Sequence, residues 1–234
     1  MSPTANGRFW RWYAKVYDLI WDSTLTAALC ERAFGDLPTR RTAVDLGCGT
    51  GLTSRPLTDA GCEVVGVDLS ADMLAIAERS GRVARTMLGD AASTGLPPHA
   101  FDIVVACNLL HLHPDPNAVL AEMSRLAAPG GAIVCSWPSN RASLTGTFVR
   151  EVRSGRPVMD AGRALALRTA VGIGGLLTRA RLHPSGVVDA AVSQWARACG
   201  ATRVAWQEVM SSAVVAVFRT MPMPQPLGRA TAPS

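Results

Sequence analysis

Three alternating glycines follow a short apolar segment, in the order Val44-Asp45-Leu46-Gly47-Cys48-Gly49-Thr50-Gly51. Because glycine has no Cβ, the backbone can turn sharply there and a ligand can lie directly on it. A helix that begins beside the loop would add unpaired backbone N–H donors. The segment therefore predicts a strand, a ligand-binding loop and a helix in succession.

The spacing of these glycines separates two classes of ligand. Dinucleotide-binding loops follow the pattern G-x-G-x-x-G, in which a pyrophosphate lies on the helix N-terminus. Here the pattern is G-x-G-x-G, and Asp45 stands two residues before the first glycine. A carboxylate at that point would repel a pyrophosphate, but it can hold a cationic amino group directly or through water. The loop therefore favours a ligand with an amino group.

Two more acidic residues end apolar segments farther along the chain. Asp68 lies 17 residues after Gly51, and a carboxylate at the carboxyl end of a strand can accept both hydroxyls of a ribose. Asp68 can instead cap the following helix, although Ser70 is suited to that role. Asp90 lies in the segment Gly89-Asp90-Ala91, where its carboxylate could accept a hydrogen bond from an adenine amino group.

The elements that must position these residues alternate along the chain. From residue 42, short apolar segments alternate with helical stretches, which is typical of a parallel sheet flanked by helices. The expected strands are 43–46, 64–67, 83–88, 101–107, 132–136, 202–209 and 213–219. The expected helices are 52–60, 70–80, 116–128 and 185–199. The pattern therefore predicts an α/β protein.

Two regions fall outside this alternation. Residues 8–34 place aromatic side chains at helical spacing and predict a helical lead-in. Residues 138–183 are rich in Arg, Gly and Ala, include a flexible glycine stretch at 172–175, and predict an insertion over the carboxyl edge of the sheet. The predicted parts are a lid at 1–41, a core at 42–137, the insertion at 138–183, the rest of the sheet domain at 184–220 and a disordered tail at 221–234.

Composition limits the classes of protein that the chain can represent. Its 234 residues are 48% apolar with a net charge of +5, which suits one domain and excludes a disordered or fibrous protein. No apolar run reaches the ~18–20 residues of a membrane span, and the N-terminus shows no secretory pattern. Six scattered cysteines without a C-x-x-C pair indicate reduced thiols, so a cytoplasmic protein without integral membrane contact is expected.

The ordered series of motifs resembles the class I S-adenosylmethionine-dependent methyltransferases, especially their small-molecule enzymes with a type 11 domain. The motifs are Val-Asp-Leu-Gly-Cys-Gly-Thr-Gly from residue 44, Gly-Val-Asp-Leu-Ser from 66, Gly-Asp-Ala from 89, Phe-Asp-Ile-Val from 101 and Pro-Gly-Gly from 129. They cover residues 42–137 in the family's order. The resemblance implies a Rossmann-like, mostly parallel seven-stranded sheet with an antiparallel last strand. It also implies S-adenosylmethionine as cofactor and S-adenosylhomocysteine as product.

The resemblance assigns a part of the cofactor to each residue of these motifs. Asp45 and the loop residues Gly47, Cys48, Gly49 and Gly51 would surround the methionine part, and Asp68 would hold the ribose. The adenine would lie between Leu69 and Met73 with Asp90 and Ala91 at its amino edge, and the Asn108 region would close over the amino acid end.

The resemblance makes the loop after residue 107 a wall of the acceptor pocket. His111 lies on this loop and is the candidate general base, with packing against cofactor or acceptor as the alternative. Other residue types there that bind metals are Cys107, His113 and Asp115. We expect no metal on this loop.

Other acceptor contacts are expected from the lead-in and from the fifth strand. Trp137 ends that strand, and Tyr13 and Tyr17 would close over cofactor and acceptor as part of a lid. Plain packing against the sheet and a membrane-surface helix are the alternatives for the lead-in.

Basic residues concentrate in the predicted insertion. Between residues 150 and 181 there are seven arginines, against Glu151 and Asp160. Such a patch could meet an anionic ligand, a lipid or nucleic acid, or it is a solvated helical face. No nucleic-acid-binding module accompanies it, so we do not expect nucleic acid as a partner. We predict that Arg153, Arg156 and Arg163 contact a carboxylate or phosphate on the acceptor.

The sequence therefore predicts a methyltransferase that moves a methyl group to an O, N or C atom of a small biosynthetic acceptor. The expected oligomeric state is a monomer or a homodimer. One alternative is a cyclase or other non-methylating catalyst on the same fold. Another is a phospholipid N-methyltransferase, which the segment Tyr13–Leu19 resembles.

Overall fold

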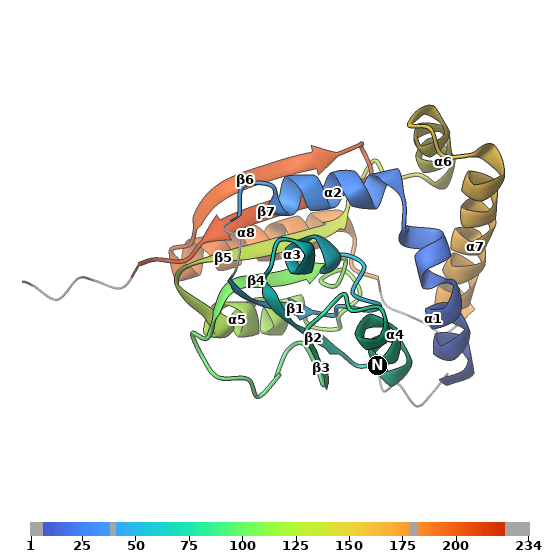
Figure 1. Cartoon of the computed structure of the whole chain (residues 1–234). Coiled ribbons are helices and arrows are strands. Elements are labelled where there is room, and N and C mark those ends of the chain that lie inside the picture. The colour runs from blue at the N-terminus through green and yellow to red at the C-terminus, as the bar shows by residue number, and fades with distance from the viewer. Residues whose placement is uncertain (1–6, 38–40, 178–181, 223–234) are drawn as a thin grey trace, which may run out of the picture.

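A seven-stranded sheet forms the centre of the molecule, with strand order β3-β2-β1-β4-β5-β7-β6 (Figure 1). The computed structural model describes residues 7–37, 41–177 and 182–222. β7 is antiparallel to both of its neighbours, whereas the pairs from β3 to β5 are parallel. The mixed sheet that the sequence predicted is confirmed.

The strands follow the apolar segments of the sequence. The five inner strands β2, β1, β4, β5 and β7 are mostly buried because helices cover both faces of the sheet. The strands are β1 (Thr42–Leu46), β2 (Glu63–Asp68), β3 (Arg85–Leu88), β4 (Phe101–Cys107), β5 (Ala127–Pro138), β6 (Thr202–Val209) and β7 (Ala213–Arg219).

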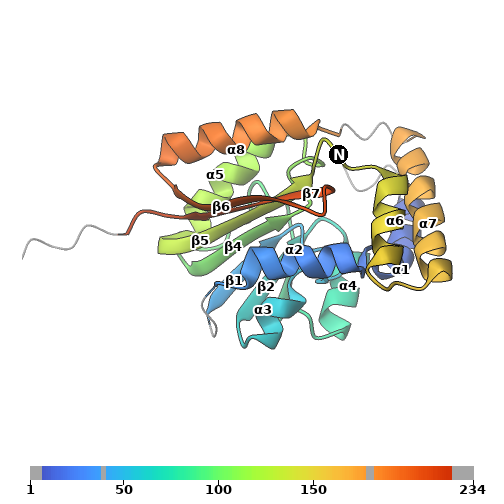
Figure 2. The same cartoon turned by 90° about the horizontal axis from the view of Figure 1, so that it is seen from above.

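Helices cover the two faces of the sheet in separate layers (Figure 2). One layer contains α5 (Pro116–Leu126) and α8 (Ser185–Cys199). The other contains α2 (Thr24–Phe34), α3 (Arg55–Asp59) and α4 (Ala71–Arg79). Successive residues of β1 alternate between the two layers, because strand side chains point to opposite faces: Val44 packs with the α5–α8 side and Ala43 with the α2–α3–α4 side.

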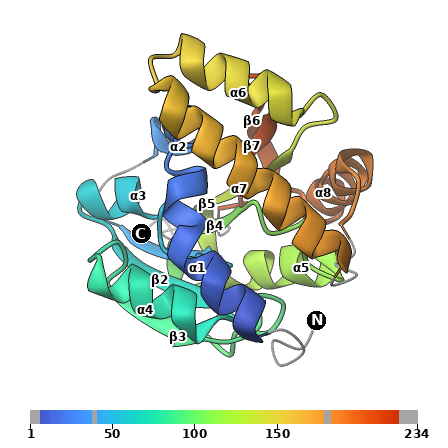
Figure 3. The same ribbon diagram turned by 90° about the vertical axis from the view of Figure 1, so that its right-hand side faces the viewer.

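A third group of helices lies across the carboxyl ends of the parallel strands (Figure 3). It consists of α1 (Gly7–Trp21), α6 (Leu144–Arg153) and α7 (Val158–Leu177). Helix α7 packs against both α1 and α6. Helices that precede and follow residues 42–137 in the chain therefore meet over the same edge of the sheet.

The structure corrects three local expectations. The helix expected at 52–60 is the single turn Arg55–Asp59, because the turns of the glycine loop continue to Ser54. Strand β5 includes residues 129–131, where the sequence indicated only the end of a helix. The register of β5 against β4 shifts between Phe101 and Ile103. Helix α7 continues through the glycine stretch at 172–175. The predicted disordered tail lies outside the described residues from 223 onward.

Within the described residues, no helix is long and apolar enough to cross a membrane. All six cysteines lie in this part of the chain and are free thiols.

Candidate active site

The glycine loop adopts backbone conformations that other residues rarely take. Gly47, Gly49 and Gly51 have φ values of 68°, 55° and 74°, in the left-handed region that favours glycine. The loop is also crowded, because a Cβ on Gly47 would lie 2.8 Å from Cδ1 of Leu109. The loop after β4 therefore packs directly on the glycine loop, as the motifs predicted for neighbouring parts of one site.

Asp45 offers an unpaired carboxylate oxygen beside this loop. Its residue is only 1% exposed, and its Oδ2 accepts hydrogen bonds from Ser54 Oγ at 2.6 Å and Thr53 Oγ1 at 3.4 Å. Oδ1 has no hydrogen-bond partner among the described residues. Burial raises the pKa of Asp45 to about 7, although the two hydroxyl donors act to lower it. A cationic donor would satisfy Oδ1 and restore the charged form.

Asp68 ties the end of β2 to the glycine loop. Its Oδ2 accepts from the Gly49 N–H at 2.9 Å, and its Oδ1 accepts from the Ser70 N–H at 2.8 Å. Ser70 itself caps α4 by accepting from the Met73 N–H, so the cap alternative for Asp68 does not hold. Burial raises the pKa of Asp68 against these hydrogen bonds. Each oxygen keeps a lone pair that can accept from a hydroxyl.

The residues expected around an adenine have unequal access. Leu69 is 41% exposed whereas Met73 is 4% exposed, so of the expected pair only Leu69 offers open apolar surface. Ala91 is buried. Asp90 accepts from the Ala92 N–H at 2.8 Å, which chiefly lowers its pKa, and its Oδ1 lies 3.1 Å from Nε2 of His113.

Asn108 turns the chain away from the end of β4. Its φ is 54°, a left-handed conformation that asparagine tolerates better than most residues. Its N–H donates to the carbonyl oxygen of Ser136 at 2.8 Å and also meets Ser136 Oγ at 3.2 Å. The bent backbone carries the following residues over the carboxyl edge of the sheet.

His111 lies on this loop with a second histidine that the sequence analysis missed. Nδ1 of His111 and Nε2 of His183 are buried, and neither has a hydrogen-bond partner among the described residues. The His183 N–H donates to the carbonyl oxygen of His111 at 2.8 Å. Burial, and then the charge of His183, lower the pKa of His111 to about 4. Only the folded chain brings His183 here, because the whole 138–183 insertion separates it from the loop.

The structure does not assemble a metal site from the other residues of this loop. Cys107 belongs to the apolar core, His113 lies against Asp90, and Asp115 caps α5 by accepting from two backbone N–H groups. In the described ranges there is no group of three His, Cys, Asp or Glu residues that could hold a metal ion.

Of the expected lid residues, Tyr17 lies over the glycine loop and Tyr13 lies beside Tyr17. The ring of Tyr17 would be 3.7 Å from a Cβ on Gly49, and it meets the ring of Tyr13 edge-on at 5.3 Å between centroids. Burial raises the pKa of Tyr13 to about 12. Asp18 fixes α1 to the loop, because it accepts from Thr50 Oγ1 at 2.6 Å and from Arg82 Nη1 at 2.7 Å.

Arginines of the predicted insertion hold α1 from the other side. Buried Glu151 pairs with Arg156 and with Arg168, the latter at 3.1 Å. Arg168 also donates to the carbonyl oxygen of Ile20 at 2.9 Å, and Arg156 donates to that of Leu19 at 3.0 Å. The prediction that Arg156 contacts an anionic acceptor is therefore wrong, because its charge is already neutralised inside the protein.

Of the other arginines between residues 150 and 181, those that the structure describes differ in their exposure and in their contacts. Arg163 lies at the surface, 3.9 Å from Asp160, and Arg153 is exposed. Arg150 donates to Ser212 Oγ. Arg179 and Arg181 lie outside the described residues.

Trp137 is a core residue and not a pocket wall. It is fully buried, its Nε1 donates to Asp189 Oδ1 at 2.8 Å, and its ring meets that of Trp206 edge-on. The expected acceptor contact is therefore wrong, because β7 and α8 cover this part of β5.

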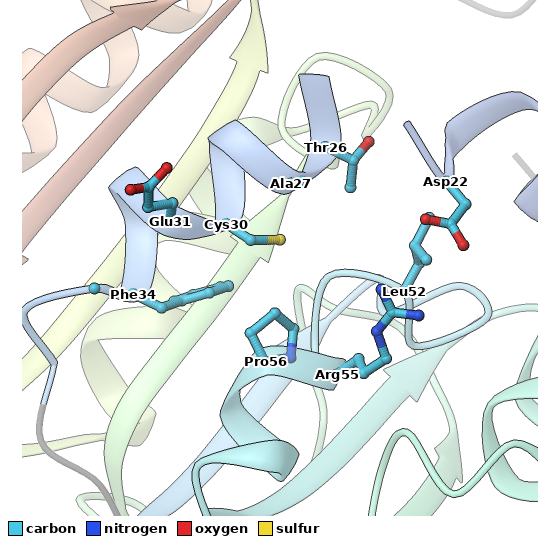
Figure 4. Close-up of a pocket in the computed structure, with 10 residues that line it drawn as sticks. Asp22, Thr26, Ala27, Cys30, Glu31, Phe34, Leu52, Arg55 and Pro56 are labelled. Atoms are coloured by element: carbon cyan, nitrogen blue, oxygen red, sulfur yellow. The ribbon is translucent and has the colours of Figure 1, made fainter. Parts of the chain in front are cut away.

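A cavity of about 370 Å³ lies between α2 and the start of α3 (Figure 4). Cys30, Phe34 and Pro56 point into it, and its rim includes Glu31 and Arg55. Cys30 Sγ lies 4.0 Å from the carbonyl oxygen of Thr53, so the cavity adjoins the outer side of the glycine loop. It contains none of the predicted site residues.

Comparisons with known proteins identify a methyltransferase domain in this chain. Residues 44–135 match a family described as "Methyltransferase domain". A ubiquinone biosynthesis O-methyltransferase of Methylococcus capsulatus is 40% identical over 101 residues, which cover 41% of this chain and 43% of that protein. A demethylmenaquinone methyltransferase of Renibacterium salmoninarum is 36% identical over 102 residues, 44% of this chain and 43% of that protein. The match thus spans less than half of these curated relatives.

Solved structures share the fold over most of the chain. One is a 1,6-didemethyltoxoflavin-N1-methyltransferase of Burkholderia thailandensis, solved with its 1,6-didemethyltoxoflavin ligand and S-adenosylhomocysteine. It has a TM-score of 0.61 at 19% identity and covers 92% of this chain and 86% of that chain. The predicted family resemblance is confirmed: residues 44–135 form a methyltransferase domain, and the chain has the fold of the class I S-adenosylmethionine-dependent methyltransferases.

Proposed function

We propose that this chain is an S-adenosylmethionine-dependent methyltransferase for a small-molecule acceptor. The observation that carries the proposal is the buried Asp45, whose Oδ1 lacks a partner beside the glycine loop. A buried unpaired carboxylate oxygen is costly, and the cofactor's ammonium group would satisfy it. Relatives named for ubiquinone biosynthesis and demethylmenaquinone methylation, and the toxoflavin-related structure, support a biosynthetic acceptor.

The cofactor would supply a methyl group bound to a sulfonium sulfur, and residues of this chain bind and orient the cofactor. Asp45 accepts from the ammonium group, and Asp68 accepts from the ribose hydroxyls while its bond to the Gly49 N–H keeps the loop in place. Leu69 offers its exposed side chain to the adenine. Tyr17 lies over Gly49 and would exclude water from the site, where alignment of donor and acceptor accounts for much of the catalysis.

The loop after β4 and helix α1 would bind the acceptor between them. His111 is the proposed general base, because its unpaired Nδ1 can accept a proton and the imidazole is neutral at pH 7. Tyr13 and Tyr17 would form the aromatic wall opposite the loop.

Thermal unfolding with three ligands tests the cofactor. A cofactor at about a hundredfold above its dissociation constant adds about 2.7 kcal/mol, which raises the melting temperature by roughly 5–10 °C for a chain of this size. We expect this rise with S-adenosylmethionine and S-adenosylhomocysteine and none with NAD. The variant Asp45→Ala should lose most of the rise. A response to NAD alone, or to none of the three ligands, would contradict the proposal.

A further inference from the structure

Two half-buried histidines form a feature that the hydrogen bonds of the described residues leave incomplete. His111 belongs to the loop after β4, and His183 belongs to the segment that leads into α8. The backbone hydrogen bond between them, 2.8 Å from His183 N to the carbonyl oxygen of His111, holds the two segments together. One ring nitrogen on each histidine is buried without a partner.

Unpaired buried nitrogens are costly, so a native fold usually satisfies them. The chain's other two histidines show this, because Nδ1 of His99 lies 3.0 Å from the carbonyl oxygen of Ala127 and Nε2 of His113 lies 3.1 Å from Asp90. His111 and His183 therefore differ from the rest in a way that indicates a missing ligand group.

The position of the pair places that ligand group at the acceptor side of the site. Leu109, two residues before His111, packs against Gly47 of the glycine loop. Asn108 directs this loop over the carboxyl edge of the sheet. The pair thus lies next to the loop on which the cofactor's methionine part would rest.

We propose that His111 and His183 together bind a hydroxyl group of the acceptor, so that the enzyme is an O-methyltransferase whose product is a methyl ether. This inference rests on the proposed function. In the tautomer with hydrogen on Nε2, His111 accepts the hydroxyl proton at Nδ1. His183 donates its Nε2–H to the same oxygen and directs a lone pair toward the methyl group.

The step balances with these groups alone. The bond between the hydroxyl oxygen and the methyl carbon forms while the carbon–sulfur bond breaks. The electron pair of the broken bond goes to sulfur, which loses its positive charge. The hydroxyl proton passes to Nδ1 of His111. This transfer becomes favourable as the attacking oxygen gains positive charge, so a weakly basic imidazole is sufficient.

The charges around the pair favour a hydroxyl over an ammonium group. An ammonium acceptor would be stabilised by a carboxylate, yet within the described part of the chain no carboxylate is hydrogen-bonded to either imidazole. The acidic groups of the site, Asp45 and Asp68, are engaged at the glycine loop. One accepting and one donating imidazole nitrogen instead match the donor and acceptor of one hydroxyl.

Nitrogen NMR of the chain's four histidines tests the inference with small probes. We would saturate ¹⁵N-histidine-labelled protein with S-adenosylhomocysteine and then titrate phenol, toluene or benzylammonium. Phenol should shift Nδ1 of His111 and Nε2 of His183 and leave His99 unchanged. Toluene, which lacks the hydroxyl, should shift neither. The inference is wrong if phenol shifts neither nitrogen, if toluene shifts them equally, or if benzylammonium binds more tightly than phenol.

Variants provide a matched comparison. His111→Phe and His183→Phe should each weaken phenol binding about tenfold, since each removes one hydrogen bond of about 1–1.5 kcal/mol from a buried group, whereas His99→Phe should not. Wild-type spectra decide the question even if a variant fails to fold. Calorimetry measures the binding of S-adenosylhomocysteine to the wild-type protein separately. If the wild type does not bind S-adenosylhomocysteine, the proposed function is wrong. If it binds S-adenosylhomocysteine but phenol shifts neither histidine nitrogen, only the hydroxyl assignment is wrong.

Discussion

The carboxylates of the site have different partners, and those partners define their roles. Asp68 is engaged at both oxygens by backbone N–H groups, so it stabilises the loop before any ligand binds. Asp45 has hydroxyl donors at one oxygen only. Its raised pKa, about 7, reflects burial without a positive partner, so we expect ligand binding to depend on pH.

Cofactor affinity should therefore fall as the pH is lowered below 7. Only ionised Asp45 attracts the ammonium group, so the affinity for S-adenosylhomocysteine should fall about tenfold for each pH unit below the pKa. Isothermal titration between pH 5 and 7.5 measures this slope. Asp45→Asn should bind weakly at every pH. A wild-type affinity that does not change with pH would exclude this role for Asp45.

The stability of the ligand-free protein should depend on pH in the opposite direction to the cofactor affinity. Because the pKa of Asp45 is raised from 3.8 to about 7 on folding, the folded state binds its proton more tightly than the unfolded state. The contribution of protonated Asp45 to the stability of the fold is thus fully present below pH 4 and is lost as the pH rises toward 7. Between pH 5 and pH 7, the raised pKa of Asp45 should therefore lower the free energy of unfolding of the wild type. Asp45→Asn lacks this ionisable group, so its free energy of unfolding should fall less over the same range. Urea titrations at the two pH values measure the difference.

Hydrogen bonds hold helix α1 on both sides, and they fix it against the glycine loop. Asp18 binds Thr50 of the glycine loop, while Arg156 and Arg168 reach backbone carbonyls near its C-terminal end. Arginine side chains at the last turn also complement the helix dipole. Glu151, 1% exposed, keeps both arginines in position, so these two members of the arginine patch attach a helix.

Removal of Glu151 should loosen this attachment. Glu151→Ala leaves Arg168, whose side chain is 5% exposed, without its counter-charge, and breaking a buried pair in this way costs about 3–5 kcal/mol. Arg163→Ala is the matched control, because that arginine forms only an exposed contact with Asp160 and should change stability by less than about 0.5 kcal/mol. Urea unfolding compares the two variants. Equal midpoints would show that Glu151 does not hold the helices together.

At the scale of the whole molecule, one sheet connects two apolar cores. The first lies under α5 and α8 and the second under α2, α3 and α4. The inner strands contribute to both, because alternate side chains face opposite layers. The ends of these strands carry Asp45, Asp68 and Asn108, so the packing of both cores sets the geometry of the site.

The two cores should therefore unfold together. Leu120→Ala removes a fully buried side chain from the α5–α8 core and should cost about 2–5 kcal/mol. Circular dichroism and tryptophan fluorescence should still report one coincident transition. Leu144→Ala, at a residue that is 46% exposed, is the control with little expected change. Two separated transitions would indicate that the layers are independent.

Local patterns in the sequence were enough to predict the sheet, the glycine loop and the positions of Asp45 and Asp68 near strand ends. These follow from local patterns, because apolar periodicity and glycine spacing are read within one short segment. Strands 101–107, 202–209 and 213–219 agree with the structure residue for residue. The acids could be assigned from their own neighbours in the chain.

The tertiary structure decided which distant residues meet. It placed His183 beside His111, used Arg156 and Arg168 to attach α1, and buried Trp137 under β7 and α8. None of these contacts can be recognised from neighbouring residues in the sequence, because each depends on where the chain after β5 packs against the rest of the protein. Side-chain burial and pairing are properties of that packing, so they became known only when the insertion and the first helix were placed over the same edge.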